Sequence, residues 1–79
     1  MWFDTKKIEE TKSAVIYAYG FETHELTGRF VLSKGDDDII ILIEKDKDYN
    51  DNTFNWIKGH ASYWLPKEGY PDKRMIATG

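Results

Sequence analysis

The chain has 79 residues, no cysteine and a formal net charge of −3, from 11 basic and 14 acidic side chains. A chain this short forms one domain, residues 1–79, and has no disulfide to stabilise it. Charged residues follow the first three positions at once, and the longest apolar run, 39–43, is too short to span a membrane. These features and the lack of cysteine favour a cytoplasmic protein. The excess of acidic over basic residues argues against nucleic acid as a partner.

Residues 1–12 are expected to be a lead-in segment, either a short helical turn or irregular chain. Ile8 is the one apolar side chain between residues 4 and 12, so this segment has no face of its own to bury. Residues 13–19 follow as a predicted strand, rich in β-branched and aromatic side chains and ended by Gly20.

Two further strands are predicted before the only helix. Residues 25–33 alternate between apolar and polar, as in a strand with one buried face. Residues 39–43 are apolar on both faces. With 13–19 these segments make an antiparallel meander. A helix is predicted from about 53 to 65, capped by residue 51, 52 or 53 and ended by Pro66, and a short strand at 74–78 completes the chain.

The expected fold is therefore a two-layer α+β domain with the element order β-β-β-α-β. The last strand should lie beside segment 13–19 and run parallel to it, because a connection through a helix is almost always a right-handed crossover. The helix should cover the face that carries Ala14 and Ala18, where small side chains allow close approach. Ile57 and Ala61 would then face Ile16.

No motif for catalysis, cofactors or metals is complete. Residues 46–51 place oxygen side chains as an EF-hand loop does, but Asp51 stands where glycine is needed and Ile57 where the bidentate glutamate belongs. His24 lies near two glutamates, yet two histidines without cysteine make a thin ligand set. No nucleophile or phosphate-loop pattern is present. We expect no catalytic, cofactor-binding or metal-binding residue.

Surplus apolar surface is the strongest functional signal. One helix can cover one sheet face, whereas two predicted strands are apolar on both faces. Either Trp2 and Phe3 cover the second face, or another chain does. We expect a non-enzymatic protein-interaction or regulatory domain that forms a homodimer. The candidate surface consists of aromatic residues and one histidine on the first predicted strand and the helix: Tyr17, Tyr19, Trp56, His60 and Tyr63.

A concentration of acid supports an alternative. Seven of the 14 acidic residues fall between positions 36 and 51. Such a cluster can imitate a phosphate backbone, so the second hypothesis is a nucleic-acid-related or nucleic-acid-mimicking protein. A metal-dependent enzyme is the third. The acidic cluster comprises Asp36, Asp37, Asp38, Asp46, Asp48 and Asp51.

Overall fold

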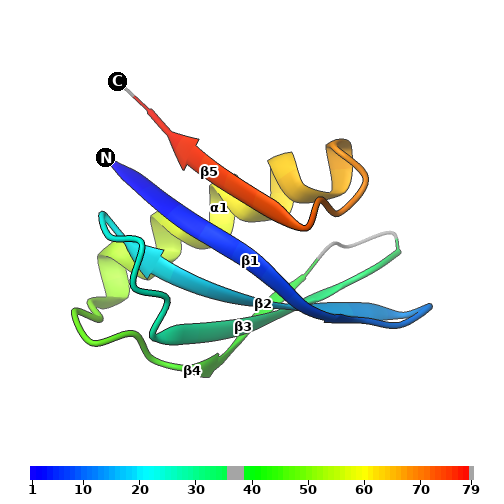
Figure 1. Cartoon of the computed structure of the whole chain (residues 1–79), viewed down its shortest axis with the longest axis horizontal. Helices are drawn as coiled ribbons and strands as arrows, with labels where there is room; N and C mark the ends of the chain where they lie inside the picture. The colour runs from blue at the N-terminus through cyan, green and yellow to red at the C-terminus, as the bar shows by residue number, and fades with distance from the viewer. Residues whose placement is uncertain (36–38, 79) are drawn as a thin grey trace.

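The computed structural model describes residues 1–35 and 39–78 as one five-stranded sheet with one helix (Figure 1). The sheet order is β4-β3-β2-β1-β5, and every neighbouring pair is antiparallel. The strands are β1 (Trp2–Glu10), β2 (Ala14–Phe21), β3 (Gly28–Ser33), β4 (Ile40–Glu44) and β5 (Lys73–Ala77), and the helix is α1 (Asp51–Lys67). The α+β class is as expected, but the strand order is different.

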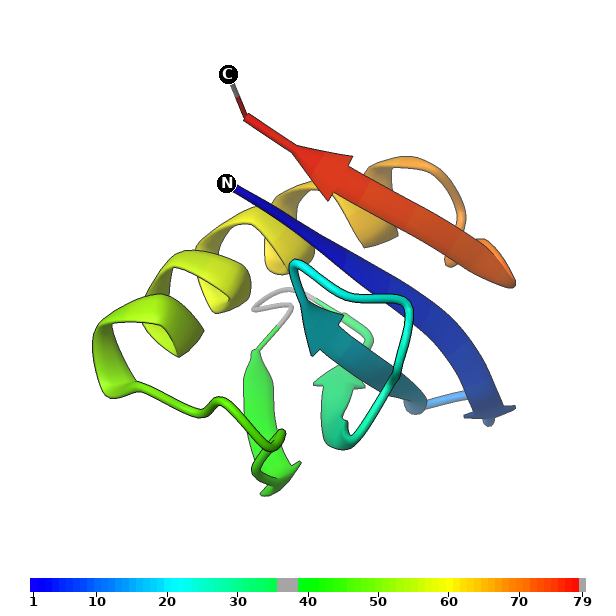
Figure 2. The same cartoon turned by 60° about the vertical axis from the view of Figure 1, so that its left-hand side comes forward.

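The expectation for residues 1–12 is wrong, because this segment is the nine-residue strand β1. β1 pairs with β2 on one side and with β5 on the other, so the last strand does not lie beside β2. β5 nevertheless runs in the same direction as β2, since both are antiparallel to β1. Backbone hydrogen bonds between Met1 and Thr78 bring the two termini side by side (Figure 2).

Alternation along β1 explains why a mostly polar segment is ordered. Phe3 and Thr5 are fully buried beneath the helix, whereas Lys6 on the other face is exposed. The Thr5 hydroxyl donates to the Arg74 carbonyl at 2.7 Å, which satisfies a buried polar group with a bond to β5. Pairing to two strands stabilises β1, although few of its side chains are apolar.

Helix α1 is longer at both ends than predicted. Asn50 is the N-cap, and its side-chain oxygen accepts from the backbone nitrogens of Asn52 and Thr53. Pro66 lies inside the last turn, where the missing N–H removes only one hydrogen bond. Gly69, with φ of +76°, follows the helix in a conformation that suits glycine.

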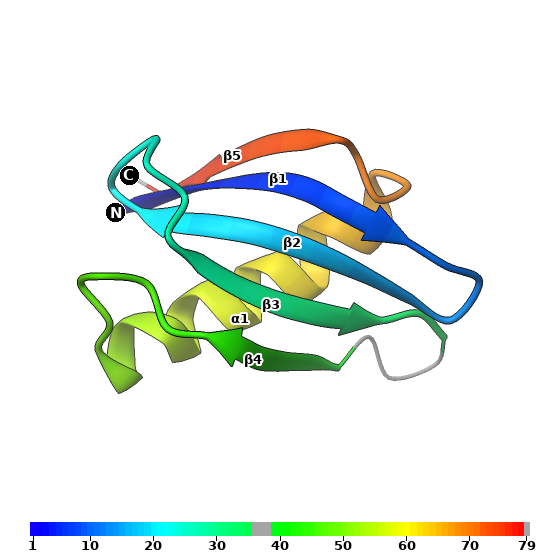
Figure 3. The same cartoon turned by 60° about the horizontal axis from the view of Figure 1, so that its bottom comes forward.

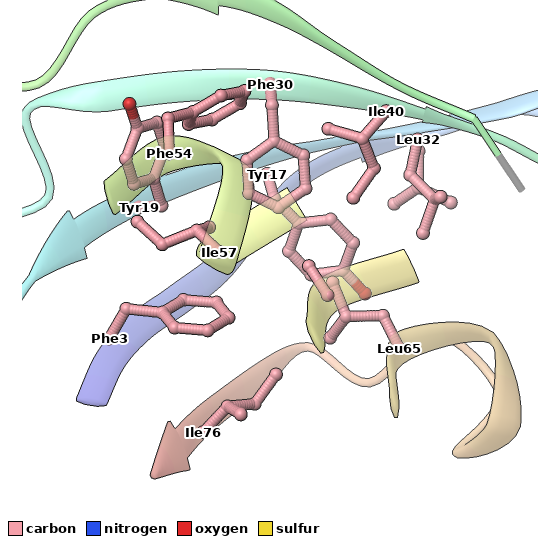
Figure 4. Close-up of a cluster of buried hydrophobic side chains, with 12 residues drawn as sticks. Phe3, Tyr17, Tyr19, Phe30, Leu32, Ile40, Phe54, Ile57, Leu65 and Ile76 are labelled. Carbon is pink, nitrogen blue, oxygen red and sulfur yellow. The ribbon is translucent and has the colours of Figure 1, made fainter. Parts of the chain in front are cut away.

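The helix covers the other face of the sheet from the one predicted. Ile57 and Ala61 are buried against the sheet as expected, but Ile16 lies on the opposite face, with the alanines of β2. Tyr17 and Tyr19 point toward the helix instead and fill the space beneath it (Figure 4). Protein interiors are closely packed, and alanines in place of these two large side chains would leave a cavity beneath the helix.

The core consists of residues from both layers. Tyr19 contacts the rings of Phe30 and Phe54, with centroids 5.6 Å away in each case, and Phe3 packs edge-on against Trp56. The members are Phe3, Val15, Tyr17, Tyr19, Phe30, Leu32, Ile40, Phe54, Ile57, Ala61, Leu65 and Ile76. All of them lie between the sheet and α1, so the second face of the sheet has no layer over it among the described residues (Figure 3).

Candidate functional site

The uncovered face of the sheet carries a continuous row of aliphatic side chains. Ile41 on β4 lies opposite Val31 on β3, which lies opposite Ile16 on β2. On the outermost strand and just before it, Ile39, Ile41 and Ile43 are 48%, 57% and 54% exposed. We call these five residues the aliphatic strip. Apolar side chains grouped in this way on a surface mark an interaction site.

The other half of the same face is charged. Lys6 on β1 lies directly opposite Lys73 on β5, and Arg29 on β3 lies opposite Glu44 on β4. No ion pair of Lys6, Lys73 or Arg29 occurs within residues 1–35 and 39–78. Cations therefore lie beside the aliphatic strip, and Met75 on β5 is a further exposed apolar side chain on the same face.

Two of the predicted surface residues are inside the protein. Tyr17 and Tyr19 are completely buried, so their assignment to an accessible face is wrong. The Tyr17 hydroxyl donates to the Pro71 carbonyl at 2.8 Å and the Tyr19 hydroxyl to the Asp46 carboxylate at 3.1 Å. Burial raises the pKa of both phenols. Their polar ends hold loops against the core, and neither can meet a partner.

The other three predicted residues lie on α1, on the far side of the molecule from the aliphatic strip. Trp56 is half-buried and packs edge-on against Phe3 and Phe21, so it closes one flank of the core. The His60 ring lies over Trp56, with centroids 4.8 Å apart. Only Tyr63 is exposed, at 56%. The helix flank is therefore largely occupied by contacts within the chain.

The acidic cluster does not form one surface. Asp46 is 8% exposed, and its carboxylate accepts the Tyr19 hydroxyl, so it supports the loop after β4. Asp51 begins α1 and accepts from the Tyr49 hydroxyl at 2.7 Å, whereas Asp48 is exposed. Residues 36–38 lie outside the described residues. Of the three cluster members that are described, two remain available to a partner.

The histidine that suggested metal or acid–base chemistry has one carboxylate neighbour. The Nδ1 atom of His24 lies 2.9 Å from an Asp4 oxygen, and its ring lies 5.2 Å from that of Trp2. The other Asp4 oxygen accepts from the Thr5 backbone nitrogen. Within the described residues no three His, Asp or Glu side chains come together, and no pocket is found. The structure therefore shows an exposed pair of one histidine and one carboxylate.

Among the described residues, the carboxyl group whose pKa departs most from its ordinary value is that of Glu10, at the end of β1. Hydrogen bonds from Lys34, at 2.6 Å, and Lys7, at 2.5 Å, lower the pKa of Glu10 from its ordinary value near 4.5 to about 2. A carboxylate with a depressed pKa stabilises the fold above the unfolded-state pKa and loses that contribution as the pH falls through the folded-state pKa. The contribution of Glu10 is therefore lost between about pH 4.5 and 2.

Replacing Glu10 with glutamine should lower the urea midpoint at neutral pH and leave it nearly unchanged near pH 2. The reason is that near pH 2 wild-type Glu10 is half protonated in the folded protein and almost fully protonated in the unfolded chain, so little of its contribution is left. Urea titrations of both proteins across this pH range measure the difference. Glu9→Gln is the control, because Glu9 lies next to Glu10 on an exposed position and makes no ion pair within the described chain. An equal effect of both substitutions at every pH would contradict the role of the two lysines.

The residues that sequence reasoning missed are those of the aliphatic strip. The signal is present in the sequence, because residues 39–43 are apolar on both faces of a strand. What was missing was which face the helix would take. The choice of the tyrosine face leaves the isoleucines exposed.

No protein-family model, no curated protein and no solved structure matches this chain. In the part of the chain that the structure describes, no helix has the length and apolar character needed to cross a membrane.

Proposed function

We propose that this chain is a non-enzymatic protein-interaction domain that associates with itself through the open face of its sheet. The observation that carries the proposal is the exposure of the aliphatic strip. Ile39, Ile41 and Ile43 are each about half exposed on an outermost strand, and Val31 and Ile16 continue the row inward. Small domains rarely leave such a group uncovered unless something binds there.

The distribution of charge supports a single apolar interaction patch rather than a surface that is apolar throughout. Lys6 on β1 and Lys73 on β5 keep that half of the face hydrated, and Arg29 on β3 lies beside the strip. Interfaces commonly have this arrangement, with an apolar centre and a charged rim. The strip would supply most of the free energy of association.

Mimicry of nucleic acid has less support. Asp46 belongs to the loop that Tyr19 holds, so the acidic cluster loses a central member. The salt response distinguishes the two functions. Association through charge weakens steeply as salt rises, whereas association through aliphatic side chains responds little.

We expect the wild-type protein to be a dimer at micromolar concentration and Ile41→Lys to be monomeric. Burying one isoleucine contributes roughly 1.5–3 kcal/mol. Each dimer loses two such side chains and gains two charges, so association should weaken by about a hundredfold or more. Sedimentation equilibrium at low and high salt measures this.

Met75→Lys is the matched control for Ile41→Lys. Met75 is 48% exposed on the same face, but it lies on β5, at the opposite edge of the sheet. This variant should remain dimeric. A wild-type protein that stays monomeric at hundreds of micromolar, or a control that dissociates as readily as Ile41→Lys, would refute the proposed function.

A further inference from the structure

The outer edge of β4 has backbone N–H and C=O groups directed to where a further strand could pair. The sheet order gives β4 a partner on one side only, β3. The Ser33 backbone nitrogen donates to the Ile39 carbonyl at 2.8 Å, so the backbone groups of Ile39 and, two residues on, of Ile41 point toward β3. By the same alternation the N–H and C=O groups of Ile40 and Leu42 point away from the sheet.

The two edges of the sheet differ in how well they resist pairing. β5 starts with two adjacent cations, Lys73 and Arg74, which oppose the approach of another strand. On the other edge, residues 39–43 are all aliphatic; in the sequence Asp38 precedes them and Glu44 follows them. Residues 39–43 themselves thus carry none of the charges and prolines that usually prevent strand addition.

We propose that two copies of the chain join edge to edge, β4 against β4, in antiparallel pairing about a two-fold axis at Ile41. This inference rests on the proposed self-association and narrows the contact to the β4 edge of the open face, so that Lys6 on β1 and Lys73 on β5 lie outside it. Ile40 of each copy exchanges backbone hydrogen bonds with Leu42 of the other. Ile41 faces its own counterpart, and Ile39 faces Ile43. The two sheets become one, with both helices on the same side.

A second copy fits this edge because the segment is nearly palindromic. Residues 39–43 read Ile-Ile-Ile-Leu-Ile, so a two-fold axis at the centre places an aliphatic side chain opposite every aliphatic side chain. An interface about a two-fold axis must be self-complementary in this way.

Other registers of the β4–β4 pairing give less complementary side-chain contacts. A shift of one residue puts the isoleucines of one copy on the helix side of the other. A two-fold axis at Leu42 sets Glu44 opposite Ile40 and Lys45 opposite Ile39, so charges meet aliphatic side chains. The register at Ile41 avoids both faults.

Cysteine scanning tests the geometry, because the chain has no cysteine of its own. Residues that oppose each other across a non-hydrogen-bonded antiparallel pair have Cα atoms about 4.5 Å apart, within the range of a disulfide. Under mild oxidation at micromolar concentration, Ile41→Cys should form a covalent dimer within minutes, and a mixture of Ile39→Cys and Ile43→Cys should form mixed disulfides. Met75→Cys on the opposite edge and Ile16→Cys on β2 should remain mostly monomeric.

Amide hydrogen exchange of the wild-type protein gives a second measurement that requires no substitution. The amides of Ile40 and Leu42 should exchange at least tenfold more slowly at high than at low protein concentration, whereas those on the outer edge of β5 should not change. A protein that sediments as a dimer but crosslinks faster through Ile16→Cys than through Ile41→Cys would overturn edge pairing and leave the proposed self-association standing. A monomer at every concentration would overturn both.

Discussion

Replacing Phe3 with alanine is expected to unfold most of the protein at room temperature. Phe3 is completely buried between β1 and α1, and its ring packs edge-on against Trp56. Removing a buried phenylalanine costs about 3–5 kcal/mol, because the lost burial is compounded by a cavity. A domain of this size without disulfides has roughly 3–5 kcal/mol of stability in total. Urea denaturation followed by far-ultraviolet circular dichroism measures the loss.

Ile8→Ala is the control on the same strand. Ile8 lies at the irregularity in the β1–β2 pairing and is 47% exposed, so its truncation should change the free energy of unfolding by no more than about 0.5 kcal/mol. Similar midpoints for the two variants would show that β1 does not belong to the cooperative core. Far weaker stability of Phe3→Ala alone would confirm that the strand is integral.

The place of β1 could not be deduced from its sequence. Between residues 4 and 12 it has charged and hydroxyl side chains with Ile8 among them, a pattern typical of an exposed segment. β1 is ordered by its pairing with β2, which follows it directly in the sequence, and with β5, which lies at the other end of the chain. Burial of two alternate side chains, Phe3 and Thr5, also stabilises it. Local propensity is weak against such tertiary pairing.

The other elements were predictable because their signals are local. The β-branched run of β2, the alternation of β3 and the apolar spacing of α1 all placed an element within a few residues of its observed bounds. The exact ends of α1 were harder to predict. Asn50 caps the helix one residue before the predicted candidates, and Pro66 is accommodated in the last turn. Helix ends depend on a few hydrogen bonds, which sequence pattern alone does not rank.

The candidate site was half predictable. The sequence predicts an uncovered apolar surface on one face of the sheet, because two strands are apolar on both faces and a single helix can cover only one of them. Which residues form that surface depended on the face that α1 covers, and this depended on volume. Tyr17 and Tyr19 fill the space under the helix and find partners for their hydroxyls, so aromatic residues favoured for an interface became core.

Replacing Gly28 with alanine should destabilise the protein, whereas the same change at Gly59 should stabilise it. A Cβ atom on Gly28 would lie 2.3 Å from a carbon of the Tyr19 ring, which is fixed between Phe30 and Phe54. The ring would have to move and would strain its hydroxyl contact with Asp46. Overpacking of this kind costs about 1–3 kcal/mol.

At Gly59 an added Cβ meets no neighbour within 4 Å. This position in α1 is exposed, so the added methyl group would project into open space. Alanine there should gain up to about 1 kcal/mol from helix propensity alone. Urea midpoints of the two variants should therefore move in opposite directions.

A double-mutant cycle isolates the cause at Gly28. In a Tyr19→Leu background the aromatic ring is absent, so Gly28→Ala should cost much less than in the wild-type protein. An unchanged cost would place the strain in the backbone of β3 rather than in the ring above it. A reduced cost would show that Gly28 is required because Tyr19, taken into the core, lies directly against the backbone of the neighbouring strand.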